Sequence, residues 1–414
     1  MNDQTEKRLL RILNHAYNEI PYFNNVINDL IDDTEEIAPE LFARLPLFNK
    51  QTIRDVGWVN FVSPRYLNDS YMPDVAKGAR TERTSGTTGN PMQILWDQND
   101  YFSSTMNHWK YRNQFFGIMP ASRMCASAKT TPGNMLYYIK GNKLTFSIKR
   151  MNWETVPQII EAINEFQPEW LYLQNSILYI LIYVANKLGM KLPDSIRYIE
   201  YLGEPICSYY REQIEKMLTV PTSNMYGCVE TNGISYECRC GQNHIIPENV
   251  HVELVDLSGA SVKEGETGYV CVTGLHNTAM PMLRYRLNDL ASMDYSGNCP
   301  CGNPNPTIQI KAARMPEFLL LDDLSVYDRA QMYCPINSGM QLFETDAQDI
   351  VFNLKMDTLD HYEVLVYQNP RSEADVEKVL REMFLAYGLP NIQFTVHATE
   401  KDDPSKPVGV LKLR

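Results

Sequence analysis

The feature that most constrains the fold is an alternation of short β-type runs with longer helical runs in the middle of the chain. Hydrophobic residues predict a strand at residues 169–173, a helix at 177–187 and a second strand at 196–202, because each run follows the period of its element. Strands that alternate with helices in this way are typical of a mixed α/β domain. Residues 250–256 and 268–273 change to a period of two, which predicts an antiparallel β region.

The two ends of the chain carry different patterns. In the first 45 residues, hydrophobic side chains recur at helical spacing and Pro21 ends the run, so this part is predicted to be helical. The last hundred residues predict a separate small α+β unit. Its predicted elements are strands at residues 350–354, 363–367 and 392–396 and a helix with Ser372 at its N-cap.

The charge balance argues against polyanionic partners. Lys and Arg number 38 and Asp and Glu number 50, which gives a formal net charge of −12. The negative electrostatic field of this charge repels nucleic acid and anionic membrane surfaces. The longest apolar run, Ile177 to Ala185, is shorter than the ~20 residues that cross a bilayer, and the first residues show no signal-peptide core. We therefore expect a cytoplasmic protein with neither nucleic acid nor membrane as partner.

A loop rich in hydroxyl groups is the strongest local signal. Residues 83–92 read Arg-Thr-Ser-Gly-Thr-Thr-Gly-Asn-Pro-Met. Hydroxyls and exposed amides can donate hydrogen bonds to phosphate oxygens, and glycine lets the backbone approach closely. The spacing differs from that of a Walker A loop. Clusters of Ser, Thr and Gly also form ordinary polar turns, so the loop by itself leaves both interpretations open.

Five segments, in order, resemble the motifs of adenylate-forming enzymes, which include the acyl-CoA and aryl-CoA synthetases. The branch that the sequence resembles most is the phenylacetate–CoA ligase-like branch, and the resemblance covers residues 5–414. The segments are residues 83–92, Gly203–Pro205, Met225–Glu230, Pro281–Asp289 and Arg314. One such motif is weak evidence, whereas five in order favour a functional interpretation.

The resemblance implies an ATP site. The implied nucleotide-binding residues are Ser85, Gly86, Thr87, Thr88, Gly89, Gly203, Glu204, Pro205, Tyr226, Gly227, Glu230, Asp289 and Arg314. A carboxylate such as Asp289 can accept hydrogen bonds from both ribose hydroxyls, and the Tyr226 ring can pack on adenine. Glu230 matches the ligand of Mg²⁺, which binds few protein carboxylates. Taken singly, these residues also fit a turn acid, a core aromatic and a solvated carboxylate.

The implied catalytic residues are Thr88, Glu230 and a lysine near the C-terminus. Residues 403–411 resemble the family's ending and place Lys406 where a lysine stabilises negative charge on the carboxylate and the α-phosphate. Lys412 is the alternative to Lys406. Other positions depart from the family pattern. They are Asn90 in place of a lysine, Val229 in place of a hydroxyl residue, Ala313 in place of a glycine, Pro316 in the hinge, and Ser405 and Gly409 around Lys406.

The fold and reaction follow from the resemblance. It implies an α/β fold with a large N-terminal adenylation domain, residues 1–313, a small mobile C-terminal α+β domain, residues 314–414, and an active site between them. The implied reaction activates a carboxylic acid, aromatic by preference, with ATP and Mg²⁺ to give acyl-AMP and pyrophosphate. CoA is the implied acceptor, with an amine or a carrier-protein thiol as alternative, and a homodimer is compatible. A non-catalytic nucleotide-binding scaffold is the hypothesis of a different class.

Two short cysteine motifs predict a metal site within residues 235–303. Cys238 and Cys240 precede His244, and Cys299 and Cys301 follow in a second loop. Tetrahedral zinc needs four such ligands, and clustered cysteines in a reducing compartment bind metal more often than they pair. Reduced thiols beside a lone histidine are the alternative. The resembled branch implies the set without Cys240, which is the substitute, and a zinc with no open position is structural.

Overall fold

The computed structural model divides into two compact units, each formed by two separate stretches of chain. Residues 1–119 and 223–315 form the first unit, and residues 120–222 and 316–414 form the second. The structure describes residues 3–312 and 349–412 except for residues 32–36, 85–91, 129, 152–153, 204–205, 207, 257, 359–360, 368–371, 375–376, 379–380, 382–392 and 400–408. The predicted domain boundary at residue 313 lies at the edge of these residues and stays a prediction.

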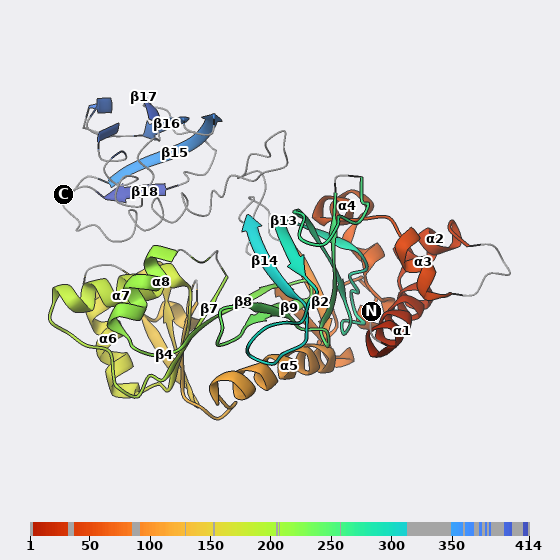
Figure 1. Cartoon of the computed structure of the whole chain (residues 1–414), viewed down its shortest axis with the longest axis horizontal. Coiled ribbons are helices and arrows are strands. Elements are labelled where there is room, and N and C mark those ends of the chain that lie inside the picture. The colour runs from red at the N-terminus through yellow and green to blue at the C-terminus, as the bar shows by residue number, and fades with distance from the viewer. Residues whose placement is uncertain are drawn as a thin grey trace. The chain divides into compact units, whose positions relative to one another are not determined.

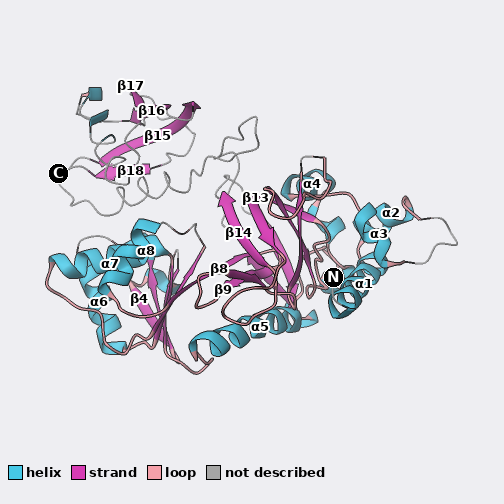
Figure 2. Cartoon of the chain, viewed as in Figure 1, coloured by secondary structure: helices cyan, strands magenta, loops and turns pink. Residues whose placement is uncertain are grey.

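The first unit begins with helices and continues into a long antiparallel sheet (Figures 1 and 2). Its helices are α1 (Asp3–Glu19), α2 (Pro21–Asn28), α3 (Pro39–Arg44), α4 (Lys50–Val56) and α5 (Gln98–Phe116), with short 3₁₀ turns η1 (Trp58–Phe61), η2 (Pro64–Tyr66) and η3 (Val75–Lys77). Its strands are β1 (Ala79–Arg83), β2 (Gln93–Asp97), β8 (Thr222–Cys228), β9 (Asn232–Glu237), β10 (Asn243–Ile245), β11 (Val250–Val255), β12 (Gly268–Gly274), β13 (Tyr285–Asp294) and β14 (Thr307–Ala312).

Strand order in the first unit places distant segments side by side. The order is β11-β12-β13-β14-β10-β9-β8, and each neighbouring pair is antiparallel. Strands β1 and β2 form a separate hairpin, in which Ala79 pairs with Asp97 and Arg83 pairs with Gln93. The predicted phosphate-binding loop is therefore the connection of a β-hairpin.

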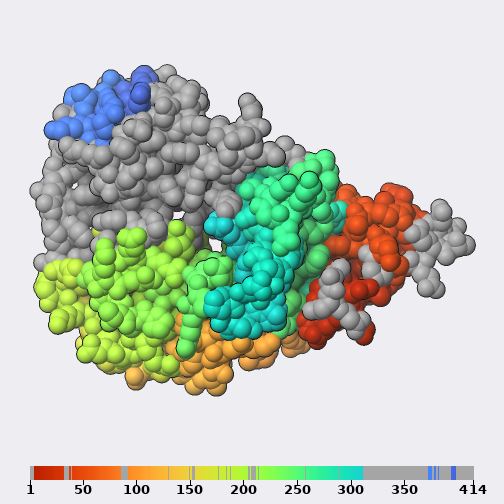
Figure 3. All heavy atoms as spheres, viewed as in Figure 1, coloured from red at the N-terminus to blue at the C-terminus, as the bar shows by residue number. Residues whose placement is uncertain are grey.

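The N-terminal helices pack against this sheet (Figure 3). One face of α1 is buried because Leu9, Ile12, Leu13 and Ala16 recur at helical spacing. These side chains share one apolar core with residues of β11 to β13. Local sequence also fixes the helix ends: Pro21 occupies the first turn of α2, where a missing N–H group costs nothing.

The second unit contains a mostly parallel sheet with helices packed against it. Its elements are β3 (Met124–Ala128), η4 (Pro132–Asn134), β4 (Tyr137–Lys140), β5 (Lys143–Ser147), η5 (Ile148–Arg150), α6 (Thr155–Phe166), β6 (Trp170–Leu173), α7 (Asn175–Lys187), β7 (Tyr198–Leu202) and α8 (Ser208–Met217). The order is β7-β6-β3-β5-β4, and only β4 runs antiparallel to its neighbour. Buried residues of α6 and α7 share one core with these strands.

A four-stranded sheet lies near the C-terminus. Its strands are β15 (Asp349–Thr358), β16 (His361–Tyr367), β17 (Gln393–Thr399) and β18 (Gly409–Lys412). The order is β17-β16-β15-β18, in which β16 and β17 are parallel and the other pairs antiparallel. The sequence predicted three of these strands and missed β18, whose backbone includes Lys412. The helix predicted after Ser372 lies mostly outside the described residues.

The predicted fold class is confirmed, because the structure is mixed α/β with a parallel part and an antiparallel part. The predicted strands at 169–173 and 196–202 are β6 and β7, and the predicted helix at 177–187 is α7. The period-two segments form β11 and β12, which pair antiparallel from Val250 opposite Gly274. Among the described residues, no helix is long and apolar enough to cross a membrane.

Candidate functional site

Two of the motif residues meet directly in the first unit. Tyr226 lies on β8 and Asp289 on β13, and the Tyr226 hydroxyl donates a hydrogen bond of 2.6 Å to Asp289 Oδ2. Burial, with the Asp289 charge beside it, raises the pKa of Tyr226 well above its usual value, so the phenol stays protonated as the donor. The two motifs are 63 residues apart in sequence, and the sheet brings their side chains into contact.

Glu230 occupies the turn between β8 and β9 and is 7% exposed. The Tyr285 hydroxyl donates a hydrogen bond of 3.0 Å to Glu230 Oε1. Burial raises the pKa of Glu230, and the bond from Tyr285 and the charge of Lys50 oppose that rise. A buried carboxylate with a cation nearby is suited to a divalent ion or a phosphate group, because charges interact more strongly away from bulk water.

Sequence reasoning did not single out Lys50, the first residue of α4. Its ammonium donates a hydrogen bond of 3.2 Å to Thr84 Oγ1, and Thr84 is the last residue before the undescribed loop of residues 85–91. Burial lowers the pKa of Lys50, Arg54 lowers it further and Glu230 opposes the change. Thr84 Oγ1 also accepts a bond from Met92 N, which closes the base of the loop. No sequence pattern marks Lys50, since a lysine in the first turn of a helix is ordinary.

Close contacts, one with backbone and one with a side chain, explain two glycines of the turn region. A Cβ atom on Gly227 would lie 2.5 Å from the carbonyl oxygen of Asn232, and one on Gly233 would lie 2.0 Å from His108 Nε2. Helix α5 therefore packs directly on the β8–β9 turn through His108, which is 3% exposed and contacts Asn249 Nδ2 at 3.2 Å. His108 thus belongs to a buried polar network that joins α5, Asn249 and the backbone of Gly233.

The other predicted nucleotide-binding residues divide into two groups. Gly203 follows β7 in the second unit, with a φ of 77° that favours glycine. The remaining ones lie outside the described residues, and so does the predicted lid lysine, Lys406. They are Ser85, Gly86, Thr87, Thr88, Gly89, Glu204, Pro205 and Arg314. In the described part of the first unit, the structure thus brings together Tyr226, Glu230 and Asp289, since Tyr226 bonds to Asp289 and the nearby Glu230 charge helps to raise the pKa of Tyr226.

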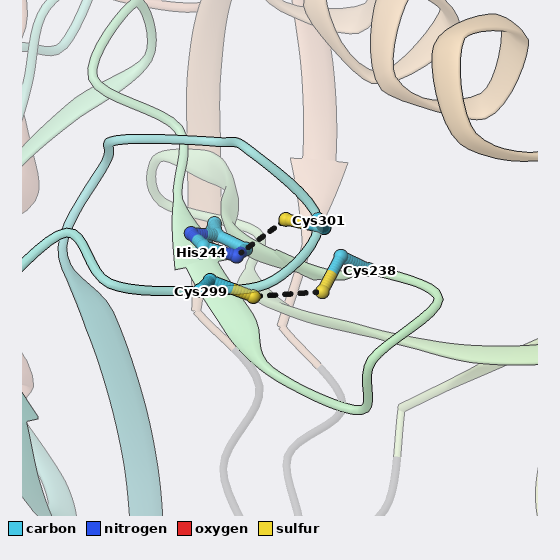
Figure 4. A group of neighbouring side chains, drawn as sticks. All are labelled: Cys238, His244, Cys299 and Cys301. Carbon is cyan, nitrogen blue, oxygen red and sulfur yellow. Dashed lines mark hydrogen bonds between the residues drawn. The ribbon is translucent and has the colours of Figure 1, made fainter.

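A second group of side chains has the composition of a zinc site (Figure 4). The ligand atoms of Cys238, His244, Cys299 and Cys301 all lie within 4.8 Å of one another. The sulfur atoms of Cys238 and Cys299 are 3.7 Å apart, close to the ~3.8 Å expected between two thiolates on one tetrahedral zinc. The Cys301 sulfur lies 3.3 Å from His244 Nε2. Of the five predicted ligands, Cys240 is exposed and outside this group.

The orientation of His244 fits a metal ligand. Its Nδ1 donates a hydrogen bond of 2.9 Å to the carbonyl oxygen of Asn305, which leaves the lone pair of Nε2 directed toward the cysteines. Metal-binding histidines commonly use a carbonyl in this way to fix the tautomer. Burial raises the pKa of the Cys299 thiol, but hydrogen bonds from Cys301 and its neighbours outweigh burial and lower the pKa to about 7.

Two similar turns carry the cysteines. Gly241 N donates to the carbonyl oxygen of Cys238 at 2.9 Å, and Gly302 N donates to that of Cys299 at 3.0 Å. Both glycines adopt left-handed φ values, 74° and 79°. The similarity of the turns supports one role for the two Cys-x-Cys-Gly sequences, with the difference that the first uses only its leading cysteine.

Comparisons with known proteins agree with the motifs. The family described as AMP-binding enzyme matches residues 84–280. Phenylacetate-coenzyme A ligase of Thermus thermophilus is 27% identical over 78% of this chain and 72% of its own length. The Escherichia coli protein of the same name is 24% identical over 69% of this chain and 66% of its own length. Both matches lie in the branch that the motifs resemble.

Solved structures support the fold. The 2-hydroxyisobutyryl-CoA ligase in a postadenylation state superposes with a TM-score of 0.68 over 99% of this chain and 88% of its own, at 14% identity. The same ligase with 2-HIB-AMP and CoA in the thioesterification state gives a TM-score of 0.63 over 98% and 88% of the two chains, at 15% identity. The family match over residues 84–280 and the sequence relatives support the resemblance to the adenylate-forming superfamily, in its phenylacetate–CoA ligase-like branch.

Proposed function

We propose that the protein activates a carboxylic acid with ATP and then transfers the acyl group to CoA. The observation that carries the proposal is the convergence of Tyr226, Glu230 and Asp289 in one unit, from motifs that the branch uses for nucleotide. The phenylacetate-coenzyme A ligases to which the chain is similar support this reaction class. An aromatic acid is the substrate class that we favour.

The bond changes are simple and balance without an added oxidant or reductant. A carboxylate oxygen attacks the α-phosphorus of ATP, the bond from that phosphorus to the bridging oxygen breaks, and pyrophosphate leaves. The acceptor thiol then loses its proton and attacks the acyl carbon, and AMP leaves with the bonding electrons. We assign stabilisation of the developing charge in the first step to Lys406 and to the loop hydroxyls, which act best when positioned in advance.

The described residues suggest how the nucleotide is held. Asp289 would accept hydrogen bonds from the ribose hydroxyls, and Tyr226 would both orient that carboxylate and contact the base. Glu230 would hold Mg²⁺, which would neutralise charge on the phosphate oxygens. Asn90 stands where the family's loop carries a lysine, and Lys50, bonded to Thr84 at the base of the loop, would restore a positive charge there.

The four clustered ligands would hold a structural zinc. Three thiolates and one imidazole complete a tetrahedral shell, which leaves no position for water or substrate. When bound, zinc would cross-link the turn after β9 to the loop between β13 and β14 and would supply no chemistry to the reaction. We therefore expect Mg²⁺ alone to act on phosphate. The proposal includes a homodimer, with which the sequence is compatible.

ATP–pyrophosphate exchange tests the first half-reaction. Purified protein is incubated with ATP, Mg²⁺, labelled pyrophosphate and one acid at a time from a panel of aryl and alkyl carboxylic acids. We expect exchange with at least one aromatic acid. The variant Glu230→Gln should abolish it, and the matched variant Glu6→Gln, an exposed residue on α1, should not. Nucleotide binding without exchange for every acid would instead favour a non-catalytic scaffold.

A second assay identifies the acceptor. Product formation from the acid that supports exchange is measured with CoA, with small amines, or with neither. A thioester formed only with CoA supports the proposal, and an amide formed only with amines would replace it with an amide ligase. Acyl-AMP that accumulates with both acceptors would point to a carrier-protein thiol.

A further inference from the structure

Arg284 has an unusual backbone conformation next to the candidate site. Its φ is 54°, in the left-handed region that residues with a Cβ atom rarely occupy. Such a conformation persists only where surrounding contacts fix it, and it is concentrated at functional positions. Arg284 precedes Tyr285, whose hydroxyl contacts Glu230.

The Arg284 side chain is 8% exposed and joins three segments. Its Nη1 donates hydrogen bonds of 3.1 Å to the carbonyl oxygen of Ala43 and 2.7 Å to that of Leu45, at the end of α3. Its Nη2 donates one of 3.2 Å to the carbonyl oxygen of Gly259, and its Nε lies 3.3 Å from Glu253 Oε2. All four contacts are therefore made by one planar guanidinium, a geometry that lysine cannot reproduce.

The backbone on both sides of Tyr285 holds the segment that follows α3. Phe48 N donates to the carbonyl oxygen of Arg284 at 3.4 Å, and Arg286 N donates to that of Phe48 at 2.8 Å. These two bonds make a parallel bridge between Phe48 and Tyr285. Phe48 is 1% exposed, so the bridge is closed to water. The chain from Leu45 to Phe48 is thus fixed at one end by the Arg284 side chain and at the other by its backbone.

This fixed segment leads directly to Lys50. Asn49 caps α4 by accepting bonds from Gln51 N at 2.8 Å and Thr52 N at 3.1 Å, and Lys50 is the first helical residue. The position of the Lys50 ammonium against Thr84 therefore depends on where the Phe48 bridge is held. Tyr285, the other residue of this bridge, contacts the Glu230 carboxylate through its hydroxyl group.

We propose that Arg284 is a positioning residue of the phosphate site. Its guanidinium fixes the segment of residues 43–48 so that the Lys50 ammonium is set relative to Glu230 and to the base of the loop at Thr84. Arg284 does not touch the nucleotide in this proposal and acts through Lys50. The inference rests on the proposed function, since it assumes that Lys50 faces the phosphates of ATP.

A double-mutant cycle on ATP affinity tests the coupling. ATP binding with Mg²⁺ is measured by calorimetry for the unsubstituted chain, Arg284→Lys, Lys50→Ala and the combined variant. Loss of a positioned charge should weaken ATP binding about tenfold in each single variant. The combined variant should bind no more weakly than Lys50→Ala alone, because Arg284 acts only through Lys50. Losses that multiply in the combined variant would overturn the inference.

A second arginine that bonds to a backbone carbonyl serves as the control. Arg11 also donates a guanidinium hydrogen bond to a backbone carbonyl, to Leu275 at 2.7 Å in the same unit. Arg11→Lys should leave ATP affinity unchanged, and a loss equal to that of Arg284→Lys would overturn the inference. No ATP binding by the unsubstituted chain would overturn the proposed function together with it. ATP binding that Lys50→Ala leaves unchanged would overturn only the role of this segment.

Discussion

The two ends of strand β9 carry two groups of very different construction. Glu230 lies in the turn before β9, and Cys238 follows its last residue. At the first end, Tyr285 of β13 bonds to Glu230, and the charge of Lys50 at the start of α4 acts on the same carboxylate. The predicted phosphate loop lies outside the described residues. At the second end, all four candidate ligands come from two turns and a short strand.

The metal ligands and the nucleotide residues are therefore positioned in different ways. Two similar local turns place the cysteines of the metal cluster, and the pairing of β10 with β14 brings the two turns together. The nucleotide residues are placed by the register of distant strands and by the bridge between Phe48 and Tyr285. We therefore expect damage to the metal cluster to appear mainly in stability, and damage to the nucleotide group mainly in binding and turnover.

The largest expected effect concerns the metal. Purified protein should contain close to one zinc per chain, and Cys238→Ser should lose it. Structural zinc contributes about 10–16 kcal/mol to the folding of small zinc domains, so we expect the unfolding midpoint of this larger chain to fall by about 10 °C or more. Elemental analysis and thermal unfolding measure the two quantities. ATP affinity of the protein that remains folded should change much less.

Cys240→Ser is the matched control for this prediction, because Cys240 lies in the same turn but is exposed. It should keep both the zinc and the unfolding midpoint. Loss of metal in Cys240→Ser, or no transition metal in protein purified without chelator, would contradict the four-ligand set and would leave reduced thiols as the interpretation.

The next effect concerns Lys406 and sharpens the catalytic side of the comparison. Lys406→Ala should slow acyl-AMP formation about 10²- to 10³-fold, because a charge that stabilises the transition state is lost. ATP affinity should change far less, since the contact between the Lys406 ammonium and the reacting groups forms only in the transition state. Single-turnover measurement of acyl-AMP separates the rate of its formation from the affinity for ATP. If Lys412→Ala produces the loss instead, the assignment of the C-terminal segment is wrong.

A smaller effect is expected for Asp289. Asp289→Ala should weaken ATP binding about 10- to 100-fold, because it removes the hydrogen bonds of a charged acceptor to ribose. The unfolding midpoint should stay within a few degrees of the original. Tyr226→Phe keeps the ring and removes only the 2.6 Å hydrogen bond to Asp289. The loss of ATP affinity in this variant should therefore be smaller than in Asp289→Ala. Unchanged affinity in calorimetry of Asp289→Ala would remove this residue from the site.

The smallest effect concerns His251 on β11, in the sheet that both groups share. Burial lowers the pKa of His251 to about 4, and the Arg284 charge adds to this effect. As the pH falls below about 6.5, His251 of the unfolded chain binds a proton, whereas His251 of the folded chain stays neutral until about pH 4. The contribution of His251 to the free energy of unfolding is therefore fully present above pH 6.5 and is lost as the pH falls toward 4. We expect a loss of about 2 kcal/mol between pH 7 and pH 5 from this group.

His251→Phe should flatten this part of the stability profile. The ring of Phe42 packs edge-on against His251 at 5.7 Å, and phenylalanine preserves that packing without a titrating group. Urea unfolding at several pH values measures the profile. An unchanged slope between pH 7 and pH 5 in the variant would show that another group causes the loss.

Much of the fold could be predicted because its signals are local. The strands at β6 and β7 and the helix α7 follow periodic patterns of hydrophobic residues, and each pattern predicts its element. Strand β18 was missed because it is short and pairs with β15, more than fifty residues earlier, from Asp349 opposite Lys412. Such a strand depends on its partner for its stability, and its own residues carry little signal.

The candidate sites show the same dependence on distance. The four metal ligands could be identified because cysteine spacing is distinctive, although only the structure separates Cys240 from the other four. Tyr226, Glu230 and Asp289 could be identified by resemblance to motifs. Lys50 and Arg284 could not, because their roles arise from contacts with carbonyl and hydroxyl oxygens that any sequence provides.

The discontinuity of the first unit has a consequence for the growing chain. Residues 1–119 complete their core only with residues 223–315, and the ribosome makes the intervening segment first. At synthesis rates of about 5–20 residues per second, the apolar face of α1 waits roughly 10–40 seconds for its partners. The second unit's parallel sheet emerges within that interval. The nascent N-terminal helices therefore need shielding by a chaperone or by transient contacts, and slowed translation between residues 120 and 222 prolongs that need.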